Sequence, residues 1–174
     1  MTRKIVITGP ESTGKSQLTT GLATHFGTVA VPEFARTYLA GLNRPYEESD
    51  LLEIARGQLA LETDGMNRAG DLLFCDTGFL VLKIWSMHRF KRCHPFILQQ
   101  LERNAPDLFL LCNIDLPWEY DPQREHPHLR QFFFDWYQRE LEHYGFSYLV
   151  INGRDEQRMQ HAIDGVTQFF SQTQ

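Results

Sequence analysis

A glycine-rich motif near the N-terminus constrains the fold more than any other part of the sequence. Residues 9–16, Gly-Pro-Glu-Ser-Thr-Gly-Lys-Ser, match the phosphate-binding pattern G-x-x-x-x-G-K-[ST]. The short β-branched run Ile5–Thr8 precedes the motif, and apolar residues at helical spacing follow it (Leu18, Leu22 and Phe26). This order predicts a strand, a tight loop and a helix, with the loop amides directed at an anionic phosphate.

Each position of the motif has an expected role. Gly9 and Gly14 permit backbone angles and a close approach that a Cβ would block. Lys15 is expected to meet the β- and γ-phosphates of a nucleotide, and the Ser16 hydroxyl to hold Mg²⁺. A glycine-rich turn that merely contains Lys-Ser is the alternative, but the flanking strand and helix argue against it. The predicted nucleotide contacts here are Gly9, Glu11, Ser12, Thr13, Gly14, Lys15, Ser16 and Gln17.

Composition excludes several other classes of protein. A chain of 174 residues with 42% hydrophobic and 22% charged residues suits one soluble globular domain spanning residues 1–174. No apolar run approaches the roughly 20 residues of a membrane span. The net charge of −5 argues against nucleic acid as the main partner. No Cys/His spacing suggests zinc, and the three unpaired cysteines predict a reducing cytoplasm. A homo-oligomer is left open.

Apolar runs alternate with helical patterns along the chain, which predicts an α/β fold of the P-loop NTPase type. We expect an open, parallel five-stranded sheet with helices on both faces and the phosphate-loop strand at its centre. The expected strands are Lys4–Thr8, Thr28–Val31, Leu72–Asp76, Leu108–Asn113 and Ser147–Ile151. Beyond the helix after the phosphate loop, helices are expected at about residues 47–69, 78–87, 95–103, 130–144 and 156–170. The glutamine-rich tail (Gln168, Gln172, Gln174) is expected to fray.

The stretch at about 117–130 is predicted to be a lid. It contains Pro117, Pro122 and Pro127, has no apolar period and carries Arg124. Long irregular loops inside compact domains are often functional, although a passive surface loop is the alternative. Arg124, and Arg130 behind it, could close over a transferring phosphoryl group.

Side chains at the carboxyl ends of the strands are the other candidates, because ligands bind at that edge of an open α/β sheet. Asp76 ends an apolar strand and is expected to bind Mg²⁺, with a helix N-cap as the alternative role. Glu33 could orient an acceptor hydroxyl or take its proton, with Arg36 one helical turn later; an ordinary i,i+3 ion pair is the alternative. The turn at 152–154 (Asn152, Gly153, Arg154) suits a flat adenine base.

These motifs together resemble the ribosylnicotinamide kinase domain of the bacterial NAD-biosynthesis regulator. The resemblance runs from residue 9 to residue 158. Besides the phosphate loop, it rests on Pro-Glu-Phe-Ala-Arg at 32–36, Asp76-Thr77, Leu116-Pro117-Trp118 with Asp121 and Arg124, and Asn152-Gly153 with Arg158.

The resemblance implies a kinase that phosphorylates the ribose 5′-hydroxyl of nicotinamide riboside at the expense of ATP and Mg²⁺. Lys15, Glu33, Asp76 and Arg124 are then the expected catalytic residues. Glu33, Arg36, Trp118 and Asp121 are the expected acceptor contacts, with Trp118 stacking on the nicotinamide ring or serving only as a packing anchor.

Two further readings remain open. One is a kinase for another nucleoside or small metabolite, and the other is a nucleotide-dependent regulatory ATPase. The regulator also has a DNA-binding segment and an adenylyltransferase domain ahead of its kinase. Because this sequence begins at the first kinase strand, neither of those activities is expected unless a partner supplies it.

Overall fold

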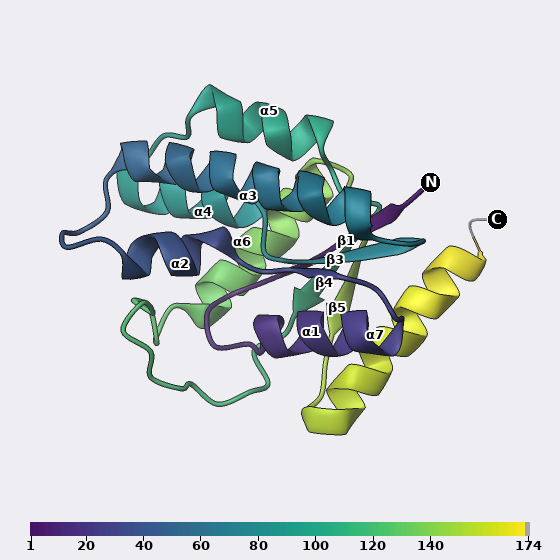
Figure 1. Cartoon of the computed structure of the whole chain (residues 1–174). Coiled ribbons are helices and arrows are strands. Elements are labelled where there is room, and N and C mark those ends of the chain that lie inside the picture. The colour runs from purple at the N-terminus through teal and green to yellow at the C-terminus, as the bar shows by residue number, and fades with distance from the viewer. Residues whose placement is uncertain (173–174) are drawn as a thin grey trace.

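A computed structural model describes residues 1–172, in which strands and helices alternate as the sequence predicts (Figure 1). The strands are β1 (Arg3–Thr8), β2 (Ala30–Val31), β3 (Leu72–Asp76), β4 (Leu108–Cys112) and β5 (Tyr148–Ile151). The helices are α1 (Lys15–His25), α2 (Phe34–Ala40), α3 (Glu48–Arg68), α4 (Phe79–Phe90), α5 (Pro95–Arg103), α6 (Arg130–His143) and α7 (Asp155–Ser171). Among these residues no helix is long and apolar enough to cross a membrane.

The five strands form one parallel sheet in the order β2-β3-β1-β4-β5. β1 pairs with β3 on one side and with β4 on the other, so the strand that leads into the phosphate loop is central. The prediction of an open five-stranded parallel sheet is therefore confirmed. In such a sheet all the carboxyl ends lie along one edge, where β1, β3 and β4 bring Thr8, Asp76 and Cys112 close together.

Helices cover both faces of the sheet (Figure 1). α1 and α7 pack on one face, over a core that includes Ile5, Phe74 and Leu110. α3, α4, α5 and α6 cover the other, where the core includes Val6 and Cys75. The three central strands β1, β3 and β4 are almost entirely buried, which explains why they read as continuous apolar runs. The lid segment after β4 lies outside both layers, next to the carboxyl edge.

Three local expectations were wrong or incomplete. β2 is shorter than predicted, since only Ala30 and Val31 pair with β3, at the edge of the sheet. Helix α2 was not predicted as a separate helix; its seven residues bury only Ala35 completely, too little for a visible period. Gln168 lies within α7 rather than in a frayed tail, Gln172 is the helix C-cap, and Gln174 lies outside the described residues.

Candidate functional site

The phosphate loop joins β1 to α1 in a conformation that requires glycine at Gly9. This residue has a φ of 133°, and a Cβ placed on it would lie 2.9 Å from the carbonyl oxygen of Cys112 at the end of β4. Gly14 is the N-cap of α1, with a φ of 73°. The loop therefore packs tightly against the end of the neighbouring strand and delivers its amides at a helix N-terminus, where an anion is favoured.

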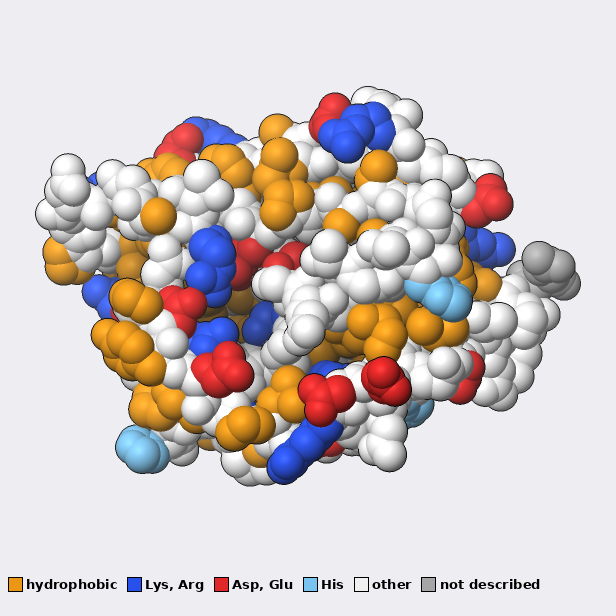
Figure 2. Space-filling view, turned by 60° about the horizontal axis from the view of Figure 1, so that its bottom comes forward, with side chains coloured by type: hydrophobic (Ala, Val, Ile, Leu, Met, Phe, Trp, Pro, Cys, Tyr) orange, Lys and Arg blue, Asp and Glu red, His pale blue; other side chains and the backbone are white. Residues whose placement is uncertain are grey.

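A cavity of about 410 Å³ lies in front of the loop. It gathers residues that are far apart in the sequence, from the loop, the end of β2, the start of α2, α4 and the lid. The predicted residues that line it are Glu11, Ser12, Thr13, Gly14, Lys15, Ser16, Gln17, Glu33, Arg36, Asp121 and Arg124. The face of the molecule drawn in Figure 2 is hollowed, with acidic and basic side chains around the opening.

Ser16 and Asp76 meet directly at the edge of this cavity. The Ser16 hydroxyl donates a hydrogen bond to Asp76 Oδ2, and Asp76 Oδ1 is buried with no hydrogen-bond partner among residues 1–172. Burial raises the pKa of Asp76, while the bond from Ser16 opposes this shift. Asp76 does not cap α4, whose N-cap is Gly78. The capping alternative is therefore not observed.

This pair of oxygens fits Mg²⁺, which prefers hard oxygen ligands and keeps several waters. The orphaned Oδ1 of Asp76 is the observation that favours a cation here. In the part of the chain described, no group of three or more His, Cys, Asp or Glu side chains could hold a metal by itself. A cation at Ser16 and Asp76 would thus depend on ligands from a bound phosphate.

Glu33 is held at the same edge by a strained residue. Thr77 has a φ of 63°, an unusual value for a β-branched residue, and its hydroxyl donates to Glu33 Oε1 at 3.3 Å. Burial raises the pKa of Glu33, against the opposing effect of Lys15; Asp76 raises it further. The side chain lines the phosphate-loop cavity together with Ser16.

Arg36 does not form the ordinary ion pair with Glu33. Its guanidinium instead contacts Asp121 of the lid, with 2.9 Å between Nη1 and Oδ2. A backbone hydrogen bond from Gln123 and the contact with Arg36 both lower the pKa of Asp121. The two predicted acceptor residues Arg36 and Asp121 therefore come together and connect α2 to the lid.

Residues 117–129 of the lid contain no helix or strand and rest on the phosphate loop. Ser12 Oγ accepts a hydrogen bond from the amide of Glu119 at 2.9 Å. The Glu11 carboxylate accepts from the amides of Glu125 and His126 at 3.0–3.1 Å. The side chains of Glu11 and Ser12 thus tie the lid to the loop at two points.

The two lid arginines have different surroundings. Arg124 lines the phosphate-loop cavity, where its Nη1 donates to the Glu119 carbonyl and lies 3.4 Å from Ser12 Oγ. Arg130, the first residue of α6, donates to the carbonyl oxygens of Ser12 and Leu116 at 3.1 and 2.8 Å. Because the Arg130 guanidinium already binds two main-chain carbonyls, Arg124 is the lid arginine that is placed to meet a ligand.

A second cavity, of about 310 Å³, adjoins the first. The two share Glu11, Leu39, Trp85 and Gln123. The second cavity is more aromatic, and its lining includes Tyr46, Trp85, His88, His126 and Phe133.

Trp85 of α4 thus stands between the two cavities, whereas Trp118 lines neither. Trp85 could not be recognised from its surroundings in the sequence, because its helix reads as core. Its place in the second turn of α4, the helix that follows β3, was the available signal.

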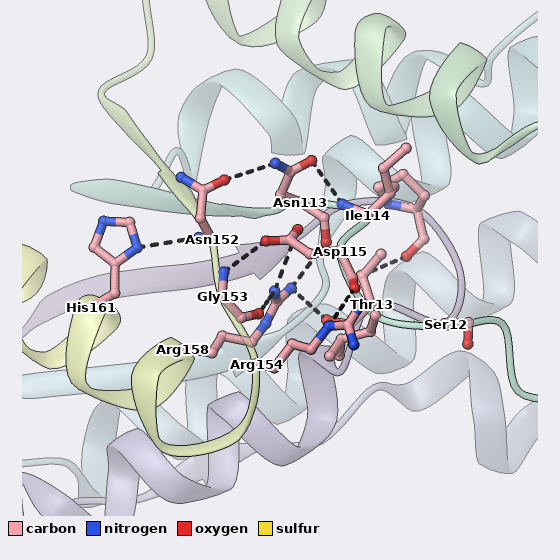
Figure 3. A network of polar contacts seen from close by, with 12 residues as sticks. Ser12, Thr13, Asn113, Ile114, Asp115, Asn152, Gly153, Arg154, Arg158 and His161 are labelled. Carbon is pink, nitrogen blue, oxygen red and sulfur yellow. Dashed lines mark hydrogen bonds and ion pairs between the residues drawn. The ribbon is translucent and has the colours of Figure 1, made fainter.

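The turn at 152–154 lies against the loop after β4, and the backbone amides of Asn152 and Gly153 are already paired (Figure 3). The amide of Gly153 donates to Asp115 Oδ2 at 2.6 Å, and that of Asn152 to His161 Nδ1 at 3.2 Å. Arg154 Nε donates to the Asp115 carbonyl at 3.1 Å. A third cavity, of about 300 Å³, is lined in part by residues that follow this turn in the sequence. Its lining residues are Gly14, Gln17, Leu18, Leu116, Asp155, Glu156, Arg158 and Met159.

Residues 4–158 of the chain match the family described as AAA domain. The chain belongs to this family. The trifunctional NAD biosynthesis/regulator protein NadR of Salmonella typhimurium is 31% identical to it over 126 residues, covering 70% of this chain and 31% of that protein. The chain therefore spans about a third of the length of this relative. The predicted resemblance to that regulator is confirmed.

Solved structures show the same fold. A crystal structure of NadR protein in complex with NR has a TM-score of 0.78 at 22% identity, covering 98% of this chain and 50% of the other. A second, of NadR protein in complex with NAD and AMP-PNP, has a TM-score of 0.73 at 20% identity, covering 97% and 49%. At these identities the match concerns the fold of the AAA domain.

Proposed function

We propose that the protein is an ATP-dependent kinase that phosphorylates the ribose 5′-hydroxyl of nicotinamide riboside. One observation carries the proposal. The phosphate-loop cavity adjoins an aromatic cavity of a size suited to a nucleoside, and Trp85 lines both. The NR and the AMP-PNP bound in the two NadR structures support an acceptor and a nucleotide of these kinds. The acceptor would lie in the aromatic cavity with its hydroxyl toward Glu33.

The donor nucleotide would lie along the phosphate loop. Lys15 and the amides of Gly14 and Ser16 would bind the β- and γ-phosphates, and the adenine would occupy the third cavity beside the 152–154 turn. The Lys15 ammonium now donates to the Pro10 carbonyl at 2.7 Å, so it already lies within the loop. Phosphoryl transfer depends mainly on positioning and charge stabilisation, which these groups would provide.

Glu33, Arg36, Asp121 and Trp118 remain our proposed acceptor contacts. Glu33 would orient the attacking hydroxyl and take its proton, and the Arg36–Asp121 pair would hold the lid over the acceptor. Trp118 would have to contact the ring from the lid side. Trp85, which the structure adds, lines both the acceptor cavity and the phosphate-loop cavity.

Ser16 and Asp76 would hold Mg²⁺, which would supply positive charge to stabilise the phosphoryl group during transfer. We expect Asp76→Asn to lower phosphoryl transfer strongly at low Mg²⁺ and to recover partly with excess Mg²⁺ or Mn²⁺, because the amide retains one ligand oxygen. Activity titrated against metal concentration measures this. An unfolding midpoint well below the parent's, with no recovery at any metal concentration, would assign Asp76 a structural role instead.

Arg124→Ala is expected to lower kcat far more than the affinity for ATP. Arg124 lines the cavity, and within residues 1–172 its guanidinium donates hydrogen bonds to Ser12 Oγ and to the Glu119 carbonyl and forms no ion pair, so it is available to stabilise charge in the transition state. Steady-state kinetics and equilibrium binding of a non-hydrolysable ATP analogue separate the two effects. Weakened binding at unchanged kcat would make Arg124 a ground-state contact and refute the proposed lid role.

A kinase and a regulatory ATPase differ in their need for an acceptor. ATP consumption should be nearly absent with Mg-ATP alone and should rise steeply when nicotinamide riboside is added. The lid resting on the phosphate loop supports this expectation, since a kinase must exclude water from the donor. Equal ATP consumption with and without any nucleoside would favour the ATPase function.

A further inference from the structure

Arg158, near the start of α7, is a buried cation whose role the sequence does not disclose. Only 4% of the residue is exposed. Its Nη2 donates to the carbonyl oxygen of Thr13 at 2.7 Å and to that of Asn113 at 3.1 Å, and its Nη1 donates to that of Gly153 at 3.0 Å. One guanidinium group therefore binds three main-chain carbonyls.

These three carbonyls belong to three different loops. Thr13 is in the phosphate loop after β1, Asn113 follows β4, and Gly153 follows β5. Figure 3 shows the Arg158 side chain pointing into the space where these loops converge, beside Asp115. The planar fork of an arginine can donate in several fixed directions at once, which a lysine ammonium on a flexible stem does less well.

The bond to Thr13 has a consequence for the neighbouring peptide. In a trans peptide unit the C=O of one residue and the N–H of the next point in opposite directions. The described residues contain no cis peptide bond. Holding the Thr13 carbonyl toward Arg158 therefore directs the amide of Gly14 away from Arg158, and Gly14 lines the phosphate-loop cavity.

We propose that Arg158 is a positioning residue that holds the phosphate loop in its anion-binding conformation. It acts through the Thr13–Gly14 peptide and does not itself touch the phosphates. The inference rests on the proposed nucleotide site, and it adds a residue outside the phosphate-loop motif that sets the affinity of that site.

The charge of Arg158 is only partly balanced. The nearest carboxylate oxygen, Asp115 Oδ1, lies 3.9 Å from Nη1, and the other oxygen of Asp115 accepts from the amide of Gly153. Arg158 Nε and Asp115 Oδ1 have no hydrogen-bond partner among the described residues. A buried cation that is incompletely paired favours an anion nearby, because Coulomb interactions are strong away from water. The charge of Arg158 and its hydrogen bond to the phosphate loop thus both favour an anion at that loop.

The test measures binding of inorganic tripolyphosphate, which engages the loop without a base or an acceptor. Arg158→Lys keeps the charge and loses the fork, whereas Arg158→Met removes both. We expect Arg158→Lys to raise the Kd for tripolyphosphate and the KM for ATP about tenfold, equal to ~1.4 kcal/mol. The KM for nicotinamide riboside should stay near the parent value. Arg158→Met should raise the Kd further.

Arg68→Met is the matched control, because Arg68 is an exposed cation on α3 that forms an ion pair with Asp64 on the same helix. It should leave all values unchanged. If Arg158→Lys binds tripolyphosphate within twofold of the parent, the inference is overturned. The inference would also be overturned if Arg158→Lys raised the Kd for tripolyphosphate and the KM for nicotinamide riboside equally and lowered the unfolding midpoint. If Arg158→Met does not fold, Arg158→Lys decides. A parent protein that binds no tripolyphosphate would overturn the proposed nucleotide site itself.

Discussion

Replacing Lys15 by alanine should reduce phosphoryl transfer by at least 10²–10³-fold, on the order of the cost of losing one donor that stabilises transition-state charge. Lys15 lines the phosphate-loop cavity, and in the described part of the chain its ammonium group donates one hydrogen bond, to the Pro10 carbonyl of its own loop. Its side chain contributes little to the core. The unfolding midpoint should therefore stay close to the parent value while kcat falls.

Arg56→Ala provides the matched control, since Arg56 is an exposed cation that pairs with Glu53 on the same helix. The measurement is single-turnover transfer from Mg-ATP to the acceptor, with thermal unfolding recorded on the same samples. A Lys15→Ala protein that retains activity within tenfold of the parent would refute the assignment of the loop lysine.

The second large effect is expected at Glu33. Glu33→Gln keeps the shape and one acceptor oxygen but loses the negative charge, so kcat should fall by on the order of 10²–10⁴, the usual contribution of general acid–base catalysis. The hydrogen bond from Thr77 to Oε1 can persist in the variant, because the amide oxygen also accepts. Binding of the ATP analogue should change little.

The pH dependence distinguishes a base from a group that only positions the acceptor. Burial raises the pKa of Glu33, so the carboxyl stays protonated to a higher pH than an exposed glutamate. If Glu33 must be ionised, kcat/KM of the parent falls as the pH drops through this raised pKa, and Glu33→Gln lacks that acidic limb.

Glu53→Gln, on the exposed face of α3, is the control for a simple loss of charge. An acidic limb that is identical in the parent and in Glu33→Gln would assign the base to another group. Glu33 would then be a positioning residue.

The parts of the site that could be predicted are those encoded by local sequence. The phosphate loop carries its own pattern, and the strand before it fixes its place in the sheet. Asp76 could be predicted because an apolar strand ends on it. Parallel pairing then brings the ends of β1 and β3 together, which places Ser16 against Asp76 without further information.

The parts that could not be predicted depend on contacts between distant segments. Arg36 looks like a partner for Glu33 by spacing, but the lid brings Asp121 to it across 85 residues. Trp85 lies on a helix whose other face is core, so its hydrophobicity alone cannot distinguish packing from ligand contact. Arg158 was recognised only as part of a family motif, because its three carbonyl acceptors carry no sequence signal.

The most direct test of the proposed activity is to identify the product. The protein is incubated with Mg-ATP and a panel of nucleosides that includes nicotinamide riboside, and the products are separated and their phosphate positions determined by nuclear magnetic resonance. The proposed function predicts nicotinamide mononucleotide, phosphorylated on the 5′-oxygen, formed in step with ADP. A phosphorylated product from another nucleoside, with none from nicotinamide riboside, would contradict the proposed substrate; ADP without any phosphorylated acceptor would contradict the kinase activity.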